Sequence, residues 1–256
     1  MNPFSLSSKT ALIAGASRGI GLAIARYLSA AGARTILAAR SADALEKNCA
    51  ELRAGGAEAE ALVLDVTSMD SIRSAAASLP PVDILVNVSG TNVRKQFERF
   101  TDEEWQRVMR TNLDGIVEVT RAVGAKMVER GGGGKIVMIG SLMSLLGLPY
   151  LTAYAVSKSG LYGLTRVLAA EWARYNIQVN LIAPGFIITD LNRAMWQRQE
   201  MKDWLKGVQA NPRPGKPEDV AGLAVFLSSA ASDYVTGQAI AVDGGYSTTR
   251  MWPFEP

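Results

Sequence analysis

The chain has 256 residues, of which 48% are hydrophobic, and it carries 27 basic and 24 acidic side chains for a net charge of +3. This length allows a sizeable core, and so small and scattered a charge excludes nucleic acid and membrane surfaces as expected partners. No histidine is present and Cys49 is the single cysteine, which removes Ser-His and Cys-His catalysis, an intrachain disulfide and a cysteine metal cluster. We therefore expect no metal site, and any acid-base chemistry must use Tyr, Lys, Asp or Glu. The amino-terminal sequence lacks an apolar signal region and no apolar run is long enough to span a membrane, which predicts a soluble, cytoplasmic protein.

Short apolar segments alternate with longer helical patterns along the whole chain. The expected strands are 10–15, 34–39, 59–65, 82–87, 135–140, 177–183 and 237–245. The expected helices are 20–32, 42–56, 68–79, 101–130, 153–173 and 216–229. Strands without polar alternation, separated by helices, indicate a parallel sheet that is buried on both faces. The pattern predicts an α/β fold, a Rossmann-type doubly wound sheet of seven parallel strands with helices on both faces. We expect one domain, 1–256, with a mobile lid at about 190–215.

A glycine-rich turn follows the first expected strand and leads directly into a helix. Its glycines are Gly15, Gly19 and Gly21, and such residues let the backbone approach a pyrophosphate at a helix N-terminus. The next strand ends at Arg40, where an acidic residue would bind the ribose 2′-hydroxyl of NAD. Together with Arg18, this arginine offers two guanidinium groups for a 2′-phosphate, which predicts NADP(H) as the cofactor.

Tyr154 and Lys158 are four residues apart in a segment that is expected to be helical, so their side chains share one face. A phenol has a reference pKa of about 10, and a nearby ammonium would favour its ionised form. Ser141 lies upstream, just after the expected strand 135–140, and its hydroxyl could hold a substrate oxygen in line with the phenol. A Tyr-x-x-x-Lys pair alone is weak evidence, so the prediction depends on the rest of the chain.

Taken together, these motifs resemble the short-chain dehydrogenase/reductase family over roughly residues 8–246. AGASRGIG is similar to the family's TGxxxGxG turn, NVSG at 87–90 stands where NNAG is usual, and PGFIIT at 184–189 resembles the segment that holds the nicotinamide. The resemblance implies a catalytic tetrad of Asn112, Ser141, Tyr154 and Lys158. The cofactor contacts that we expect are Gly15, Ser17, Arg18, Gly19, Ile20, Gly21, Arg40, Ser41, Asp65, Val66, Asn87, Ser89, Gly90, Tyr154, Lys158, Pro184, Gly185, Ile187 and Thr189.

The resemblance also implies a mechanism for interconverting a secondary alcohol and a ketone. Tyr154 would be the acid in carbonyl reduction and the base in alcohol oxidation, while Lys158 would lower the pKa of Tyr154 and hold the nicotinamide ribose. Ser141 would polarise the substrate oxygen, and Asn112 would expose its backbone at a kink in the long helix and anchor a water. Hydride would move directly between nicotinamide and substrate carbon, so no metal is needed.

Two departures from the family pattern stand on strands that should be neighbours in the sheet. Ala14 replaces a threonine, and Val88 and Ser89 replace Asn and Ala of NNAG. We expect that an apolar contact has replaced a polar one and that the cofactor site is intact.

The substrate is expected to bind between the loop after Gly90, the loop after Ser141 and the lid, with Arg94, Ser141, Met143, Tyr154 and Trp196 as candidate contacts. Among family members the chain looks most like gluconate 5-dehydrogenases, so Arg94 is expected to clamp the carboxylate of a sugar acid. The alternative is 3-oxoacyl-(acyl-carrier-protein) reductase, for which Arg94, Lys95, Arg99 and Arg193 could form a basic patch. A third alternative is a non-catalytic nucleotide-binding protein, but in such a protein the four tetrad residues would have no role.

The expected helices, here taken as 102–130 and 151–175, carry more apolar surface than one sheet face can cover. Leu161, Leu164, Val167, Leu168 and Trp172 spread over more than one stripe, as in a helix that is buried on two sides. The family resemblance implies a homotetramer built on these helices and on the last strand.

Overall fold

The computed structural model describes residues 2–190 and 192–250, and it contains one seven-stranded sheet. The strands are β1 (Thr10–Ala14), β2 (Arg34–Ala39), β3 (Ala59–Val63), β4 (Ile84–Asn87), β5 (Gly134–Ile139), β6 (Ile177–Pro184) and β7 (Ala239–Val242). All neighbouring pairs are parallel, and the order is β3-β2-β1-β4-β5-β6-β7. The fold class predicted from sequence is confirmed. The strand order reverses between β1 and β4, and ligands of such sheets bind at that point, beyond the carboxyl ends of the strands.

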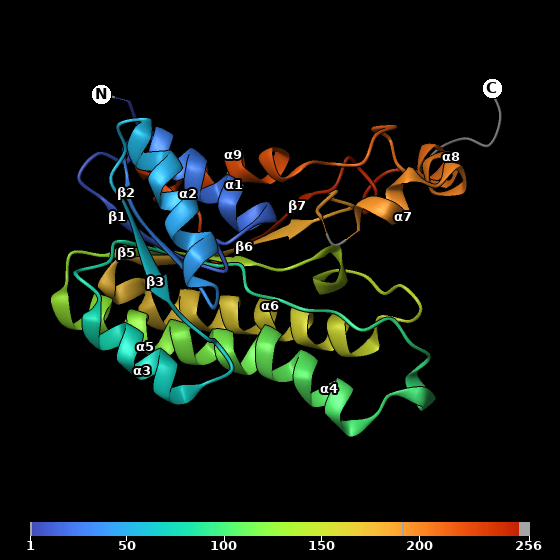
Figure 1. Cartoon of the computed structure of the whole chain (residues 1–256), viewed down its shortest axis with the longest axis horizontal. Coiled ribbons are helices and arrows are strands. Elements are labelled where there is room, and N and C mark those ends of the chain that lie inside the picture. Colours follow the sequence, from blue (N-terminus) through green and yellow to red (C-terminus); the bar gives the residue numbers. More distant parts are fainter. Residues whose placement is uncertain (1, 191, 251–256) are drawn as a thin grey trace.

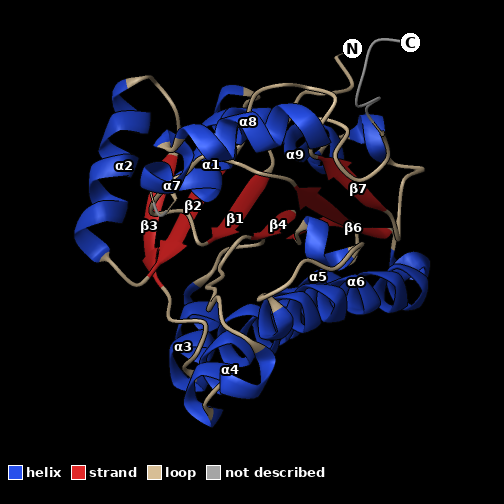
Figure 2. Ribbon diagram, turned by 90° about the vertical axis from the view of Figure 1, so that its right-hand side faces the viewer, coloured by secondary structure: helices blue, strands red, loops and turns tan. Residues whose placement is uncertain are grey.

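Helices cover both faces of the sheet, as Figures 1 and 2 show. They are α1 (Gly19–Ala30), α2 (Ala42–Ala54), α3 (Met69–Ser78), α4 (Asp102–Met109), α5 (Gly115–Arg130), α6 (Thr152–Trp172), α7 (Arg193–Gln197), α8 (Gln199–Val208) and α9 (Pro217–Ser228). Helices α1, α2 and α9 lie on one side, and α3, α5 and α6 on the other. Alternate residues of β1 enter different cores, because successive side chains of a strand point to opposite faces: Ala11 and Ile13 pack with α1 and α9, and Leu12 and Ala14 with the opposite layer.

The expected helix 101–130 is one continuous run in three pieces. Thr101 caps α4, and its capping box with Glu104 is formed as predicted. A π-helical turn at Arg110–Asp114 then joins α4 to α5. Single π-turns of this kind often occur at functional sites. Here the turn includes Asn112, so the helix type changes at the residue where a kink was expected.

Most boundaries differ from the expected ones by one to three residues, as usual for helix and strand ends. The last strand is shorter than the expected 237–245, because Gly237 and the pair Gly244-Gly245 adopt positive φ angles that no extended strand has. The expected lid folds into α7 and α8 and lies beyond the carboxyl ends of the strands (Figure 1), with Leu191 outside the described residues.

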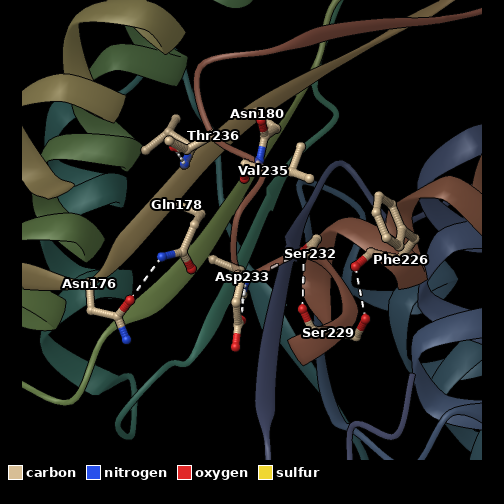
Figure 3. A network of polar contacts seen from close by, with 11 residues as sticks. Asn176, Gln178, Asn180, Phe226, Ser229, Ser232, Asp233, Val235 and Thr236 are labelled. Atoms are coloured by element: carbon tan, nitrogen blue, oxygen red, sulfur yellow. Dashed lines mark hydrogen bonds and ion pairs between the residues drawn. The ribbon is translucent and has the colours of Figure 1, made fainter. Parts of the chain in front are cut away.

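A polar network fixes the connection between α9 and β7 against the sheet (Figure 3). The side chain of Asn180 on β6 donates to the Val235 carbonyl at 2.7 Å and accepts from the Gln238 amide at 3.1 Å. Lys135 on β5 reaches Asp233 of the same connection at 2.7 Å. Buried polar side chains must find partners, so these bonds hold the last strand in register beside β6.

Candidate active site

The turn after β1 has glycine at the positions where its backbone approaches other backbone most closely. Gly15 has φ +107°, and a Cβ atom there would lie 2.7 Å from the Ser89 amide nitrogen. At Gly21 a Cβ would lie 2.1 Å from the Gly15 carbonyl oxygen, so only glycine allows α1 to approach this closely. Gly19 faces Thr189, whose methyl carbon would be 3.5 Å from an added Cβ. The turn therefore lies directly beside the segment that follows β6, as a cofactor site shared between them requires.

Arg18 and Arg40, the two expected phosphate ligands, are exposed. The amide and hydroxyl of Thr67 donate to Asp65 at 2.9 and 2.7 Å, and together with a smaller effect of Arg40 they hold the pKa of that carboxyl below its ordinary value. Asp65 stays ionised within the field of Arg40. The structure thus places Arg40 and Asp65, which follow β2 and β3, close enough for their charges to interact, and their contact with a cofactor stays a prediction.

Asn48 is a residue of this region that sequence reasoning missed. It lies on α2, is 8% exposed, and its amide donates to the Ser17 carbonyl of the glycine turn at 3.0 Å. Arg18 follows Ser17 directly, and α2 begins just after Arg40. The bond therefore connects the backbone next to one expected phosphate ligand to the helix that follows the other. An asparagine in the middle of a polar helix gives no pattern from which such a contact could be predicted.

The tetrad residues that were expected come together at the carboxyl ends of β4 and β5. Asn112 is fully buried in the π-turn, where its amide donates to the Thr91 carbonyl at 2.9 Å and to the Ser157 hydroxyl at 3.1 Å. Its side-chain oxygen accepts from the Thr91 amide at 2.7 Å. Ser157 in turn donates to the carbonyl of Tyr154 at 2.7 Å. Asn112 thus ties the loop after β4 to the helix that carries the tyrosine.

Tyr154, Lys158 and Ser141 form the polar centre of the site. The Lys158 ammonium lies 5.8 Å from the centre of the Tyr154 ring, and it donates to the Ile139 carbonyl at 2.8 Å. Burial raises the pKa of Tyr154, and a hydrogen bond with the Ser141 side chain and the positive charge of Arg94 lower it by less. Burial also lowers the pKa of Lys158, which is 3% exposed, to about 8. Tyr154 is therefore protonated at neutral pH, and the expected lowering of its pKa by Lys158 stays a prediction for the complex with cofactor.

Two further expected site residues, Asn87 and Trp196, are buried in the protein interior. Asn87 is 1% exposed, and its amide donates to the Thr120 hydroxyl at 2.9 Å, behind β4. Trp196 of α7 is 3% exposed, with its ring centre 5.7 Å from that of Phe186. Phe186 also contacts Trp204 and Tyr246, so Trp196 belongs to the apolar packing that holds the lid. Its contact with substrate stays a prediction.

Gly115 is a second residue whose importance was not apparent from the sequence. It begins α5, and a Cβ atom there would lie 2.2 Å from the Val66 carbonyl oxygen. The loop after β3 that contains Asp65 and Val66 therefore packs directly on the end of the π-turn. Only the structure brings these segments, some fifty residues apart, together.

Known proteins resemble this chain over nearly its whole length. Residues 15–247 match a family model described as enoyl-(acyl carrier protein) reductase. Gluconate 5-dehydrogenase of Gluconobacter oxydans 621H is 38% identical over 250 residues, 96% of this chain and 97% of the relative. The chain belongs to the short-chain dehydrogenase/reductase family. The resemblance stated from the motifs is confirmed.

Two other members represent the two substrate classes that the sequence left open. A 3-oxoacyl-(acyl-carrier-protein) reductase of Pseudomonas aeruginosa PAO1 is 40% identical over 248 residues, 94% of this chain and 98% of the relative. A crystal structure of gluconate 5-dehydrogenase from Burkholderia cenocepacia J2315 in complex with NADP and tartrate is 39% identical. It superposes with a TM-score of 0.93 and covers 97% of this chain and 98% of that one. Because the chain is about equally identical to both proteins, sequence identity does not decide between the two substrate classes.

As a short-chain dehydrogenase/reductase, the protein has the residues that a nicotinamide dinucleotide needs. The cradle at Gly15 and Gly21 fits a pyrophosphate, because any side chain there would collide with backbone. Within residues 2–190 and 192–250, no cluster of three or more His, Cys, Asp or Glu side chains could hold a metal ion. In the same part of the chain, no helix combines the length and apolar character needed to cross a membrane.

Proposed function

We propose that this protein is an NADP(H)-dependent oxidoreductase that interconverts a secondary alcohol and a ketone on a sugar acid, as a gluconate 5-dehydrogenase does. The observation that carries the proposal is the position of Arg94. This arginine is exposed on the loop after β4, where its guanidinium contacts Met195 of α7 at 3.0 Å, and its positive charge has a small lowering effect on the pKa of Tyr154. A substrate carboxylate bound to the guanidinium would leave the rest of a sugar acid to reach the hydroxyl groups of Tyr154 and Ser141.

Arg18 and Arg40 would hold the 2′-phosphate of the cofactor, and the glycine turn its pyrophosphate. The cofactor supplies or accepts the hydride. Ser141 would donate a hydrogen bond to the substrate oxygen, and Tyr154, which burial keeps protonated, would give that oxygen its proton in ketone reduction. Oxidation of the alcohol needs the opposite protonation state, so it should become faster as the pH rises.

The alternative substrate, an acyl chain on an acidic carrier protein, needs a basic patch at the mouth of the site. Two of the four candidate side chains are already paired: Lys95 lies 2.7 Å from Glu104, and Arg193 lies 2.8 Å from Asp190. Pairing reduces the charge that is available to a carrier protein. This supports the sugar acid over the carrier-bound substrate.

The test is NADPH oxidation with 5-keto-gluconate, a small neutral ketone and a 3-oxoacyl thioester as substrates. Arg94→Ala should raise KM for the acid by roughly 10- to 150-fold, the effect of losing a charge-assisted pair of about 1.5–3 kcal/mol. Arg99→Ala, which removes a nearby exposed arginine, is the matched control and should change that KM little. Equal effects of Arg94→Ala on neutral and acidic substrates would refute the clamp. Turnover of carrier-bound substrate with steep salt dependence would favour the alternative.

We also propose a cytoplasmic homotetramer that is assembled through α5, α6 and the last strand. Helices α5 and α6 lie side by side on one face of the molecule (Figure 2), and Val167 on α6 is 54% exposed. A partner helix in the assembly would cover this side chain, together with Val156 of the same helix, which is 44% exposed. Sedimentation of the purified protein as a monomer at micromolar concentration would contradict the proposal.

A further inference from the structure

The segment 91–96, which we call the strap, carries Arg94 and is anchored at both ends. At its first residue, Asn112 binds both the amide and the carbonyl of Thr91, at 2.7 and 2.9 Å. Because Asn112 is fully buried in the π-turn and also bonds to Ser157 of α6, this end of the strap is held to α6, the helix that carries Tyr154.

The other end of the strap is held by Lys95 through two independent contacts. Its backbone amide donates to the Tyr150 carbonyl at 3.0 Å, which joins the strap to the loop before α6. Its ammonium donates to both carboxylate oxygens of Glu104, at 2.8 and 2.7 Å. Glu104 is itself fixed, because it accepts from the Thr101 amide at 3.0 Å in the capping box of α4. Lys95 therefore binds a carboxylate that is already held in place.

Tyr150 is in a backbone conformation that its residue type disfavours. Its φ is +68° and its side chain is 57% exposed. A bulky residue at positive φ is strained, and such strain persists only where surrounding contacts impose it. Here the left-handed turn directs the Tyr150 carbonyl to the Lys95 amide. The strain occurs four residues before Tyr154 and one hydrogen bond away from the residue that follows Arg94.

Arg94 lies between these two anchors. One guanidinium nitrogen is 3.0 Å from the sulfur of Met195 on α7, so the strap also contacts the lid. Since the strap is anchored at Thr91 and Lys95, the backbone from which the Arg94 side chain extends is held in place relative to α6, and this limits where the guanidinium can lie.

We propose that Lys95, Glu104 and Tyr150 are positioning residues that set the distance from the carboxylate clamp to the catalytic hydroxyl, and so determine which acidic substrates react. This rests on the proposed function of Arg94 as the clamp. A substrate whose carboxylate and reacting carbon are separated by that distance binds both groups at once. A shorter or longer acid binds only one of them.

The first test is Glu104→Gln with the acid and the neutral ketone as substrates. Glutamine still completes the capping box, but it lacks the negative charge that pairs with the ammonium. KM for the acid should rise about two- to fivefold, the factor that a partly exposed ion pair can supply, with little change in kcat. Glu103→Gln on the same turn of α4 is the matched control, because it removes an equal charge without contacting Lys95, and KM should not change.

A double-mutant cycle separates positioning from a general loss of structure. In the Arg94→Ala background, Glu104→Gln should have no further effect on KM for the acid, because the group that it positions is gone. An effect that persists there, or that is equal for the neutral ketone, would overturn the inference. If Arg94→Ala itself leaves the acid unaffected, then the proposed function fails. If only the effect of Glu104→Gln is missing, then the positioning fails alone.

The second test addresses the strained turn. Tyr150→Gly tolerates positive φ and should retain KM for the acid within about twofold, whereas Tyr150→Val opposes that conformation and should raise it. Equal increases for both variants would indicate that the tyrosine ring itself contacts substrate, and would overturn the backbone role assigned to Tyr150.

Discussion

The buried ammonium of Lys158 should make the stability of the apoenzyme depend on pH in a defined direction. Burial lowers the pKa of this lysine from 10.5 to about 8, so between these values the unfolded chain binds a proton that the folded chain has lost. The free energy of unfolding therefore rises with pH across that window, because the unfavourable burial of the charge, fully present below pH 8, is progressively removed. Integrating this difference gives a gain of about 1.3 kcal/mol between pH 7 and pH 9.

Lys158→Met is the reference protein for this measurement, since it has the same fold without the titrating group. The loss of the hydrogen bond to the Ile139 carbonyl adds an offset that does not change with pH, and all other titrations cancel in the difference between the two proteins. In urea unfolding at pH 7, 8 and 9, the free energy of unfolding of wild type relative to the variant should increase by about 1.3 kcal/mol from pH 7 to pH 9. This corresponds to about 3–5 °C in Tm. Parallel curves would show that Lys158 has the same pKa in both states and refute the reasoning.

Three further predictions concern the reaction and the cofactor. Tyr154→Phe should lower kcat by roughly 10²- to 10⁴-fold while NADPH still binds, as fluorescence titration can show; activity within a few-fold of wild type would exclude Tyr154 as the acid. Arg40→Asp combined with Ala39→Asp should reverse a preference for NADPH over NADH, and equal use of both cofactors by wild type would refute that preference. Asn48→Leu should raise KM for NADPH about two- to tenfold with kcat nearly unchanged, because the glycine turn loses a hydrogen bond. The neighbouring Cys49→Ser is its control, and an equal change in both would indicate general destabilisation.

The sheet could be predicted from the sequence because each of its signals is local. Uninterrupted apolar runs indicate buried parallel strands, and a glycine turn between the first strand and helix indicates a nucleotide site. Tyr154 and Lys158 were found in the same way, since helical spacing alone places them on one face. The π-turn at Asn112 was expected only through the family resemblance, because nothing in its own sequence marks a change of helix type.

Contacts between distant segments could not be predicted in this way. The bond from Asn48 to Ser17 and the packing of Gly115 on the Val66 carbonyl depend on which loops the sheet order brings together. Trp196 is a further case, because an aromatic residue in a lid suggests substrate contact, whereas only the structure shows that this ring packs against Phe186. Sequence periodicity identifies the elements, and the tertiary contacts then decide what each exposed or buried side chain touches.

The residues that depart from the family pattern, Ala14, Val88 and Ser89, contact one another through backbone hydrogen bonds. The amides of Val88 and Ser89 both donate to the Ala14 carbonyl, at 2.8 and 3.0 Å, and these bonds are independent of the three side chains. Ala14 is also fully buried, among apolar residues of the core below the sheet. Gly15, by contrast, cannot be exchanged, because any Cβ would meet the Ser89 amide. A change of side chain next to the cofactor cradle therefore leaves its shape intact as long as the glycine remains, which is why the altered motif is compatible with nucleotide binding.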